Sequence, residues 1–323
     1  MVMAKKFNVF ITAPIHEDGI KLLEKETNVI ISKKHPSMLT SNDIINNAKN
    51  ADALIVTGNV EKITKEIIES LPKLKIIARY GVGYDNVDVQ AATKKGIYVT
   101  IAPVLEETVA DHAFALLLCL ARNICKANYH MKNKKWESDL FIGTDIYNKT
   151  IGIIGLGRIG TKVAERAKGF KMKILYYDII RKKELEEKLN LEYKNLDDLL
   201  KESDFIIISV PLTNETKNMI SEREFSLMKK SAFLINIARG PIIDHEALIK
   251  ALKERRIAGA GLDVFYQEPL PIDDPLLDLD NVILTPHIAS NTIECRKRMS
   301  ITVAEEVLRV LHGEKPKYAI NIL

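Results

Sequence analysis

The run Thr150-Ile-Gly-Ile-Ile-Gly-Leu-Gly-Arg-Ile-Gly160 decides the fold class. An apolar stretch of strand length leads directly into the spacing GxGxxG, which opens a helical pattern. Gly155 permits a tight turn, Gly157 lets a pyrophosphate approach the backbone, and Gly160 lets helix and strand pack closely. The helix N-terminus offers N–H groups and the positive end of the helix dipole. A strand, a glycine turn and a helix in this order predict a dinucleotide site.

An acidic residue ends the next apolar stretch, Lys173–Tyr177, and bears on the choice of dinucleotide. Asp178 lies about as far beyond the glycines as the carboxylate that binds the ribose of a dinucleotide. A carboxylate accepts hydrogen bonds from the ribose 2′-hydroxyl and repels the 2′-phosphate of NADP, so the sequence favours NAD as the cofactor. The cations Arg181, Lys182 and Lys183 follow closely, and a guanidinium there can grip a phosphate. NADP therefore stays open as the alternative.

Short apolar stretches rich in β-formers alternate with helix-length amphipathic stretches along the whole chain. This alternation is typical of βαβ units, so we expect an α/β protein with doubly wound parallel sheets. The predicted strands span residues 8–12, 29–32, 53–57, 75–78, 97–100, 150–154, 173–177, 205–210, 232–237, 258–263 and 282–284. Predicted helices span residues 41–49, 106–125, 159–169, 245–254 and 292–311.

Three of the predicted helices carry further signals. Ser41 is the expected N-cap of the first. The helix over residues 106–125 is apolar along Ala113–Ala121, so it must be buried on most sides, either between domains or between subunits. Gly313 and Pro316 are expected to close the last helix.

Length and composition fit a globular protein of two domains. The chain has 323 residues, of which 46% are hydrophobic and 28% charged, and this exceeds what one core usually serves. Its 47 basic and 43 acidic residues give a net charge of +4 and are scattered along the chain. Nothing in this distribution indicates a nucleic-acid partner.

The cysteines and the most apolar stretch bear on the surroundings of the protein. Cys119, Cys125 and Cys295 show no CxxC spacing and no histidine at ligand spacing, which argues against disulfides and against a metal site. The first ten residues lack an apolar core of signal-peptide length, and Ala113–Ala121 is too short to span a bilayer. We therefore expect a reducing, cytoplasmic setting without a membrane partner.

Ionisable residues stand in three segments at the expected ends of strands, where open α/β sheets bind their ligands. The segments are NIARG (236–240), DVFYQEPLP (263–271) and TPHIAS (285–290). Reduction of a 2-keto acid needs a cation for the carboxylate and the carbonyl oxygen, a hydride donor, and an acid that protonates the oxygen. An arginine, a dinucleotide and a histidine supply these three.

Arg239, Glu268 and His287 are the predicted catalytic residues. The planar fork of Arg239 binds a carboxylate bidentately, and a histidine such as His287 ordinarily titrates near neutrality. Glu268 would favour the protonated ring and fix its tautomer. The alternative is that all three are ordinary surface charges, but their joint occurrence at three strand ends argues for a site. No role is assigned to the other histidines, which are His16, His35, His112, His130, His245 and His312.

The chain resembles the D-isomer-specific 2-hydroxyacid dehydrogenase family over essentially its whole length. The motifs that carry the resemblance are RYGVGYDN (79–86), ETVADH (107–112), the glycine loop 155–160, RG (239–240), GLDVF (261–265), QEPLP (267–271) and TPH (285–287). The resemblance implies that Arg239 and His287 bind and protonate the substrate, that Glu268 pairs with His287, and that Asp263 meets the nicotinamide amide. A mild departure is Asn148, where relatives often have glycine, and asparagine tolerates a left-handed backbone.

The resemblance also implies further contacts to substrate and cofactor. Backbone amides near Val82 and Gly83 would help to hold the substrate carboxylate, as suits a glycine-rich turn after a strand. Six more positions match cofactor contacts of the family, namely Thr108, Arg158, Ile159, Pro211, Ile237 and Ala238.

The domain organisation that the resemblance implies is discontinuous. Residues 1–103 and 290–323 would form a flavodoxin-like substrate domain, into which a Rossmann NAD domain, residues 104–289, is inserted. This return of the chain follows from the resemblance and not from the pattern of strands. The resemblance further implies a homodimer, usually built through the nucleotide domain, and an active-site cleft that closes to exclude water.

The motifs favour a 2-keto acid without a phosphate group. Residues 103–112 and the segment around Lys149 are most similar to glyoxylate and hydroxypyruvate reductases, whereas residues 83–86 and 92–97 are also similar to 3-phosphoglycerate dehydrogenases. The loop TGNVE (57–61) offers no cation for a phosphate, and the chain ends without the regulatory domain that many phosphoglycerate enzymes append. Phosphoglycerate dehydrogenase is the runner-up, and an NAD-sensing corepressor without turnover is the alternative from another class.

Overall fold

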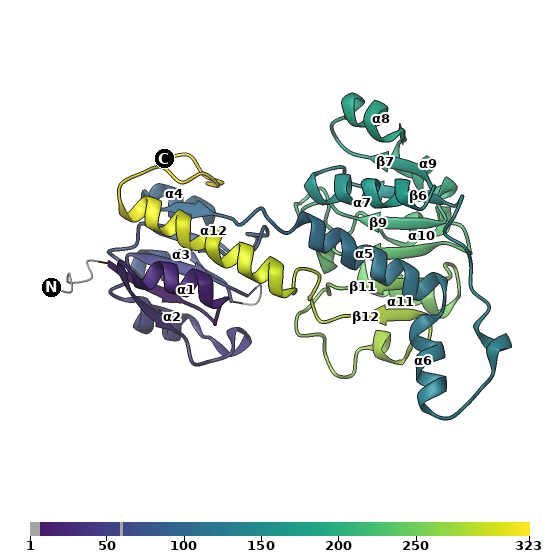
Figure 1. Ribbon diagram of the computed structural model, residues 1–323, viewed down its shortest axis with the longest axis horizontal. Coiled ribbons are helices and arrows are strands. Elements are labelled where there is room, and N and C mark those ends of the chain that lie inside the picture. The colour runs from purple at the N-terminus through teal and green to yellow at the C-terminus, as the bar shows by residue number, and fades with distance from the viewer. Residues whose placement is uncertain (1–6, 59–60) are drawn as a thin grey trace. The chain divides into compact units, whose positions relative to one another are not determined.

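The structure is a computed structural model that describes residues 7–58 and 61–323. Outside the described residues lie Asn59 and Val60 of the loop 57–61, and residues 1–6 of the stretch inspected for a signal peptide. The chain divides into two compact units (Figure 1). Met1–Leu105 and Ser290–Leu323 form the first, called the terminal unit, and Glu106–Ala289 form the second, called the central unit.

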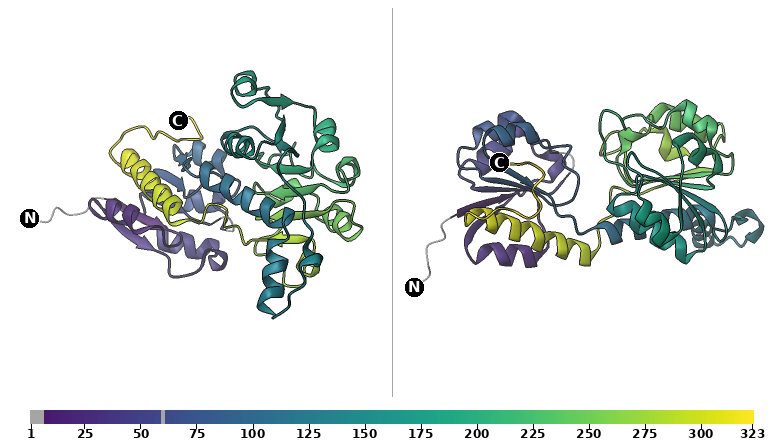
Figure 2. Two further views of the ribbon diagram at one scale, coloured as in Figure 1. Left: turned by 45° about the vertical axis from the view of Figure 1, so that its right-hand side comes forward. Right: turned by 90° about the horizontal axis from the view of Figure 1, so that it is seen from above.

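The terminal unit is a five-stranded parallel sheet with helices on both faces (Figure 2, right). Its elements are β1 (Phe7–Ile11), α1 (Glu17–Glu24), β2 (Thr27–Ile31), η1 (Pro36–Met38), α2 (Ser41–Ala48), β3 (Ala53–Val56), α3 (Lys65–Ser70), β4 (Ile76–Arg79), α4 (Val89–Lys94), β5 (Tyr98–Thr100) and α12 (Ile293–Leu311). The strand order β2-β1-β3-β4-β5 is that of flavodoxin-like folds. Strands β3 and β4 are buried along their whole length, because helices cover both sides of a central parallel strand.

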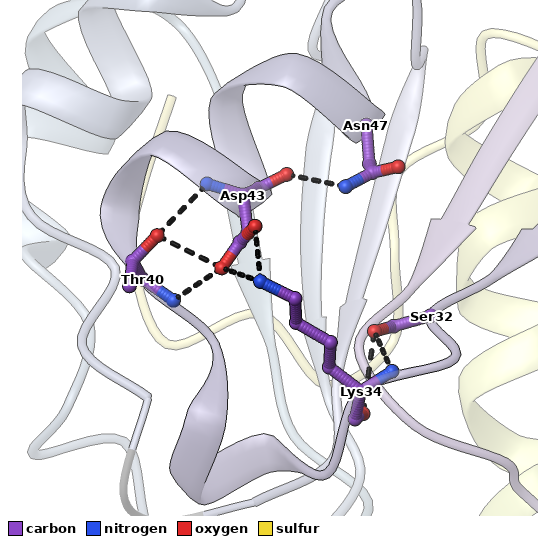
Figure 3. A network of polar contacts seen from close by, with 5 residues as sticks. All are labelled: Ser32, Lys34, Thr40, Asp43 and Asn47. Atoms are coloured by element: carbon purple, nitrogen blue, oxygen red, sulfur yellow. Dashed lines mark hydrogen bonds and ion pairs between the residues drawn. The ribbon is translucent and has the colours of Figure 1, made fainter.

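The N-cap of α2 is Thr40, and the prediction of Ser41 is wrong (Figure 3). The Asp43 N–H donates to Thr40 Oγ1 at 3.2 Å, and the Thr40 N–H donates to the Asp43 carboxylate at 3.0 Å. Lys34 Nζ lies 2.7 Å from Asp43 Oδ1, and this ion pair together with the Thr40 hydrogen bonds lowers the pKa of Asp43 to about 2. The helix begins after Thr40 because Asp43 stands three residues beyond it, as a capping box requires.

The central unit is a seven-stranded parallel sheet in the order β12-β11-β10-β9-β6-β7-β8. Its elements are α5 (Glu106–Ala121), α6 (Ile124–Lys132), η2 (Ser138–Phe141), β6 (Thr150–Ile154), α7 (Arg158–Gly169), β7 (Lys173–Tyr177), α8 (Lys183–Leu189), β8 (Leu191–Tyr193), α9 (Leu196–Glu202), β9 (Phe205–Ile208), α10 (Glu222–Leu227), β10 (Phe233–Asn236), η3 (Gly240–Ile242), α11 (His245–Lys253), β11 (Gly259–Leu262), η4 (Pro275–Asp278) and β12 (Val282–Leu284). The chain starts the sheet at β6 and builds outward to both sides. The topological switch point therefore lies between β6 and β9, where such sheets bind ligands at their carboxyl ends. The predicted fold class, α/β with two doubly wound parallel sheets, is confirmed.

Residues 106–125 do not form one helix, so that prediction is wrong. Helix α5 ends at Ala121, α6 begins at Ile124, and the two are bent by 65°. Asn123 adopts a left-handed backbone with φ 51°, and the Ala121 carbonyl accepts the N–H of Thr144 at 2.8 Å. The returning chain thus takes a carbonyl that a longer helix would use itself.

The apolar face of α5 is buried within the central unit, which is neither of the two predicted placements, between domains or between subunits. It packs on α7 and on strands β10 and β11. Helix α6 buries no residue and extends away from the sheet (Figure 1). No single helix within the described residues is long and apolar enough to cross a membrane.

Candidate active site

The glycine loop after β6 has the close contacts that its sequence predicts. Gly155 has φ 94°, and a Cβ there would lie 2.7 Å from Val210 Cγ1. A Cβ on Gly160 would lie 2.0 Å from the Gly155 carbonyl oxygen, so helix α7 and the loop touch backbone to backbone. Gly157 faces open space, as a residue approached by a ligand should. The loop therefore fits a pyrophosphate at the N-terminus of α7.

Asp178 lies at the end of β7 beside the glycine loop. Its Oδ2 accepts the Leu156 N–H at 2.8 Å, and its Oδ1 accepts the Ile180 N–H at 3.1 Å. The carboxylate is thereby held at the place where a dinucleotide offers its ribose hydroxyls. The residues present fit NAD.

Arg181, which keeps NADP open in the sequence, is engaged within the protein. Its Nε and Nη2 donate to the Glu186 carboxylate at 2.8 and 2.9 Å. The guanidinium, together with the Tyr176 hydroxyl, lowers the pKa of Glu186 to about 2. A 2′-phosphate would have to compete with this carboxylate and to face Asp178, so the geometry favours NAD as well.

The other predicted cofactor contacts all belong to the central unit. They lie at the start of α7 (Arg158, Ile159), beyond β9 (Pro211), after β10 (Ile237, Ala238) and in the first turn of α5 (Thr108). Strands β6, β9 and β10 are neighbours in the sheet, so the segments that follow them leave from one edge. The cofactor contacts predicted in the segments that follow these three strands thus share that edge.

Arg239 follows β10 and is tied to the loop that carries Glu268. Its Nη1 donates to the Ala238 carbonyl at 2.7 Å, and its own carbonyl accepts the Asn236 side-chain amide at 2.9 Å. A Cβ on Gly240 would lie 1.9 Å from the carbonyl carbon of Phe265. Only glycine allows the Arg239 turn to approach the next loop this closely.

Glu268 and His287 are hydrogen-bonded to each other, as predicted from the sequence. His287 Nδ1 lies 2.7 Å from Glu268 Oε2, and Glu268 Oε1 accepts the Phe265 N–H at 3.1 Å. His287 has φ 52°, a left-handed conformation that is uncommon for residues other than glycine. The pair can hold a proton on the imidazole and orient the ring, because a carboxylate fixes the tautomer of the histidine it contacts.

Asp263 is completely buried and holds the segment that carries His287. Its carboxylate accepts the Thr285 hydroxyl at 2.6 Å and the N–H groups of Ile288 and Ala289, each at 2.8 Å. His112, to which the sequence analysis assigns no role, lies 3.4 Å from Asp263 and 3.0 Å from Thr285 Oγ1. The sequence gives His112 no role of its own, because the only signal at this position is that it ends the motif ETVADH.

Val82 and Gly83, the predicted contacts to the substrate carboxylate, belong to the terminal unit. They follow β4 in a turn in which Gly81 has φ 157°. The Arg79 guanidinium is almost fully buried and donates to the carbonyl oxygens of Gly83, Val56 and Gly58 at 2.8, 2.9 and 2.6 Å. The hydrogen bond from this buried cation to the Gly83 carbonyl therefore fixes the turn.

Comparison with known proteins identifies the family. Residues 114–289 match the family described as D-isomer specific 2-hydroxyacid dehydrogenase, NAD binding domain. A glyoxylate reductase of Pyrococcus horikoshii is 50% identical over 98% of this chain and 96% of its own, and one of Korarchaeum cryptofilum is 49% identical with the same coverage. A D-lactate dehydrogenase of Aquifex aeolicus, solved with NAD and lactic acid, has a TM-score of 0.84 at 34% identity, over 95% of this chain and 96% of that one. The chain belongs to the D-isomer specific 2-hydroxyacid dehydrogenase family and is an NAD-dependent oxidoreductase.

Proposed function

We propose that the protein is a glyoxylate reductase that reduces glyoxylate, and also hydroxypyruvate, to the 2-hydroxy acid. The observation that carries the proposal is the hydrogen bond of 2.7 Å between His287 and Glu268, since a protein that only senses NAD needs no acid beside its cofactor. The glyoxylate reductases of Pyrococcus horikoshii and Korarchaeum cryptofilum, which match this chain over nearly its whole length, support the choice of substrate.

The catalytic roles follow from the chemistry of each side chain. Arg239 binds the substrate carboxylate through its planar guanidinium and polarises the adjacent carbonyl. Bound NADH supplies the hydride for the carbonyl carbon. His287, whose Nδ1 contacts Glu268, gives a proton from Nε2 to the carbonyl oxygen. Glu268 stabilises the protonated ring, whereas Asp263, whose side chain is completely buried, supports the segment that carries His287.

The terminal unit is the substrate domain in this proposal, and the central unit is the NAD domain. Val82 and Gly83 contribute backbone N–H groups to the substrate carboxylate, and a glycine-rich turn after a strand suits this task. Arg79 supports the turn from the buried side, because its guanidinium donates to carbonyl oxygens of this turn, of the end of β3 and of the loop after β3.

A homodimer is the proposed assembly, and the segment from α6 to the start of β6 supports it. We call residues 124–147 the α6 segment. Its exposed apolar side chains are Ile124, Tyr129, Met131, Trp136, Leu140, Ile142 and Tyr147. A run of such side chains is typical of protein interfaces. Within the described residues the three cysteines form no disulfide, which fits the reducing cytoplasm that we propose as the location.

The experiment that tests the proposal follows NADH oxidation with glyoxylate, hydroxypyruvate, pyruvate and phosphohydroxypyruvate, each repeated with NADPH. We expect the highest kcat/KM with glyoxylate or hydroxypyruvate and NADH. A preference for phosphohydroxypyruvate would assign the protein to phosphoglycerate oxidation instead. Binding of NADH without turnover of any acid would leave the sensing role and would overturn the proposal.

A further inference from the structure

His112, Thr285 and Asp263 form a network, called here the Asp263 network, that contacts the segment that carries His287. Asp263 receives four hydrogen-bond or ion-pair contacts although its side chain has no exposed surface. A buried carboxylate with this many donors remains charged, since each donor replaces a bond lost from water.

The balance of burial and hydrogen bonding at Asp263 supports this. Burial opposes ionisation, but the contacts from His112, Thr285 and the N–H groups of Ile288 and Ala289 together lower the pKa of Asp263 below its ordinary value. The ionised carboxylate is a strong acceptor, and it accepts hydrogen bonds from the two backbone N–H groups that immediately follow His287.

The backbone of His287 needs such support. A left-handed φ of 52° is unfavourable for a residue with a side chain, and it persists only where the surroundings fix it. The His287 N–H donates to the Thr285 carbonyl at 2.9 Å, and Asp263 takes the next two N–H groups. The conformation of residue 287 is therefore fixed from both sides.

We propose that His112 and Thr285 are positioning residues for His287. They hold Asp263 so that its oxygens fix the backbone of residues 287–289, and this backbone aims the imidazole at Glu268. The inference rests on the proposed function, in which His287 is the proton donor. It gives the buried Asp263 a task inside the protein, and it makes His112 of α5 a residue on which the reaction depends.

The test replaces the hydroxyl of Thr285. Thr285→Val keeps the shape and removes the donor to Asp263, whereas Thr285→Ser keeps the donor. We expect kcat with glyoxylate to fall roughly 10-fold or more in the valine variant, with KM changed less than twofold, and to recover in the serine variant. His112→Leu should follow the valine variant, and His112→Gln, which keeps an amide donor, should lose less.

A matched control is Thr302→Val in α12 of the terminal unit, where the hydroxyl donates to the Arg298 carbonyl at 2.9 Å and has no contact with the Asp263 network. It removes the same group from a buried threonine and should leave kcat unchanged. A general loss of packing would lower the stability of both Thr285→Val and Thr302→Val. It would not lower kcat at an unchanged KM in Thr285→Val while leaving Thr302→Val unaffected.

A second readout does not depend on turnover. In protein labelled with ¹⁵N-histidine, the Nδ1 proton of His287 should exchange with water faster in Thr285→Val than in the wild type, because its bond to Glu268 is no longer aligned. If the wild type reduces no keto acid, the proposed function fails. The exchange rate still tests whether Thr285 positions His287. Unchanged exchange, or an unchanged kcat in a folded and active Thr285→Val protein, would overturn the inference.

Discussion

At the scale of a single residue, the negative charge of Glu268 stabilises the protonated His287 that the proposed reaction uses. Glu268→Gln keeps the size of the side chain but removes the negative charge that faces the imidazole at 2.7 Å. Without that charge the imidazolium that donates the proton loses its stabilising partner, so we expect the optimum for glyoxylate reduction to move toward acid. At neutral pH kcat/KM should fall by about 100-fold, the lower end of what a positioned general acid contributes. A pH profile of kcat/KM measures both.

The control for this substitution is Glu187→Gln, which neutralises an exposed carboxylate on α8. It changes the net charge of the protein by the same amount and should leave the profile unchanged. An optimum that stays in place in Glu268→Gln would mean that Glu268 only orients the ring.

Residues with a chemical signature were predictable from the sequence, and those with a purely spatial role were not. Glu268 and His287 stand in motifs whose residue types suit proton transfer, and the structure places them in contact. His112 meets Thr285 at 3.0 Å, but more than half the length of the chain separates the two, and no local pattern signals the contact. The left-handed backbone of His287 is equally invisible, since histidine is not a residue that turns select for.

At the scale of the element, the junction between the loops after β10 and β11 depends on Gly240. A Cβ there would meet the Phe265 carbonyl carbon at 1.9 Å, so Gly240→Ala must push the two loops apart. We expect a loss of about 1–3 kcal/mol in the free energy of unfolding, as for other overpacked sites. Reduction of glyoxylate should also slow, because the displaced loops carry Arg239 and Glu268. Urea unfolding and steady-state kinetics measure the two effects.

Gly169, the last residue of α7, provides the opposite case. A Cβ there has no neighbour within 4 Å, so Gly169→Ala should stabilise the protein by roughly 0.5–1 kcal/mol and leave kcat unchanged. Equal effects of the two substitutions would contradict the close packing at Gly240.

The boundaries of elements were predicted best where one local interaction sets them. Strand β6 and helix α7 agree with the prediction to within one residue, because the glycine loop separates them. The bend at Asn123 was not predicted, since it depends on Thr144 returning to the end of α5. Strand β8 was missed as well, because three residues at the edge of a sheet show no periodicity.

At the scale of the whole molecule, the alternation of strands and helices sufficed to predict two doubly wound sheets. It did not predict that α12 returns to the first of them. Residues 293–311 have the pattern of an amphipathic helix, and such a pattern reports that one face is buried without naming the surface that covers it. Helix α12 packs against α1, which begins at Glu17, and sequence distance hides that contact.

The proposed homodimer makes the last prediction, and it concerns the α6 segment. Trp136 and Ile142 have 82% and 84% of their surface exposed, a large apolar area for a chain on its own. In sedimentation equilibrium the protein should have twice the 36.4 kDa mass of one chain, and the double variant Trp136→Asp, Ile142→Asp should be monomeric, because charges in an apolar interface lose their water without gaining partners. The control is Ile322→Asp, which adds one such charge at an isoleucine that is 94% exposed near the end of the chain and should leave the dimer intact. A wild-type mass of one chain would refute the dimer, and a dimeric double variant would move the interface away from the α6 segment.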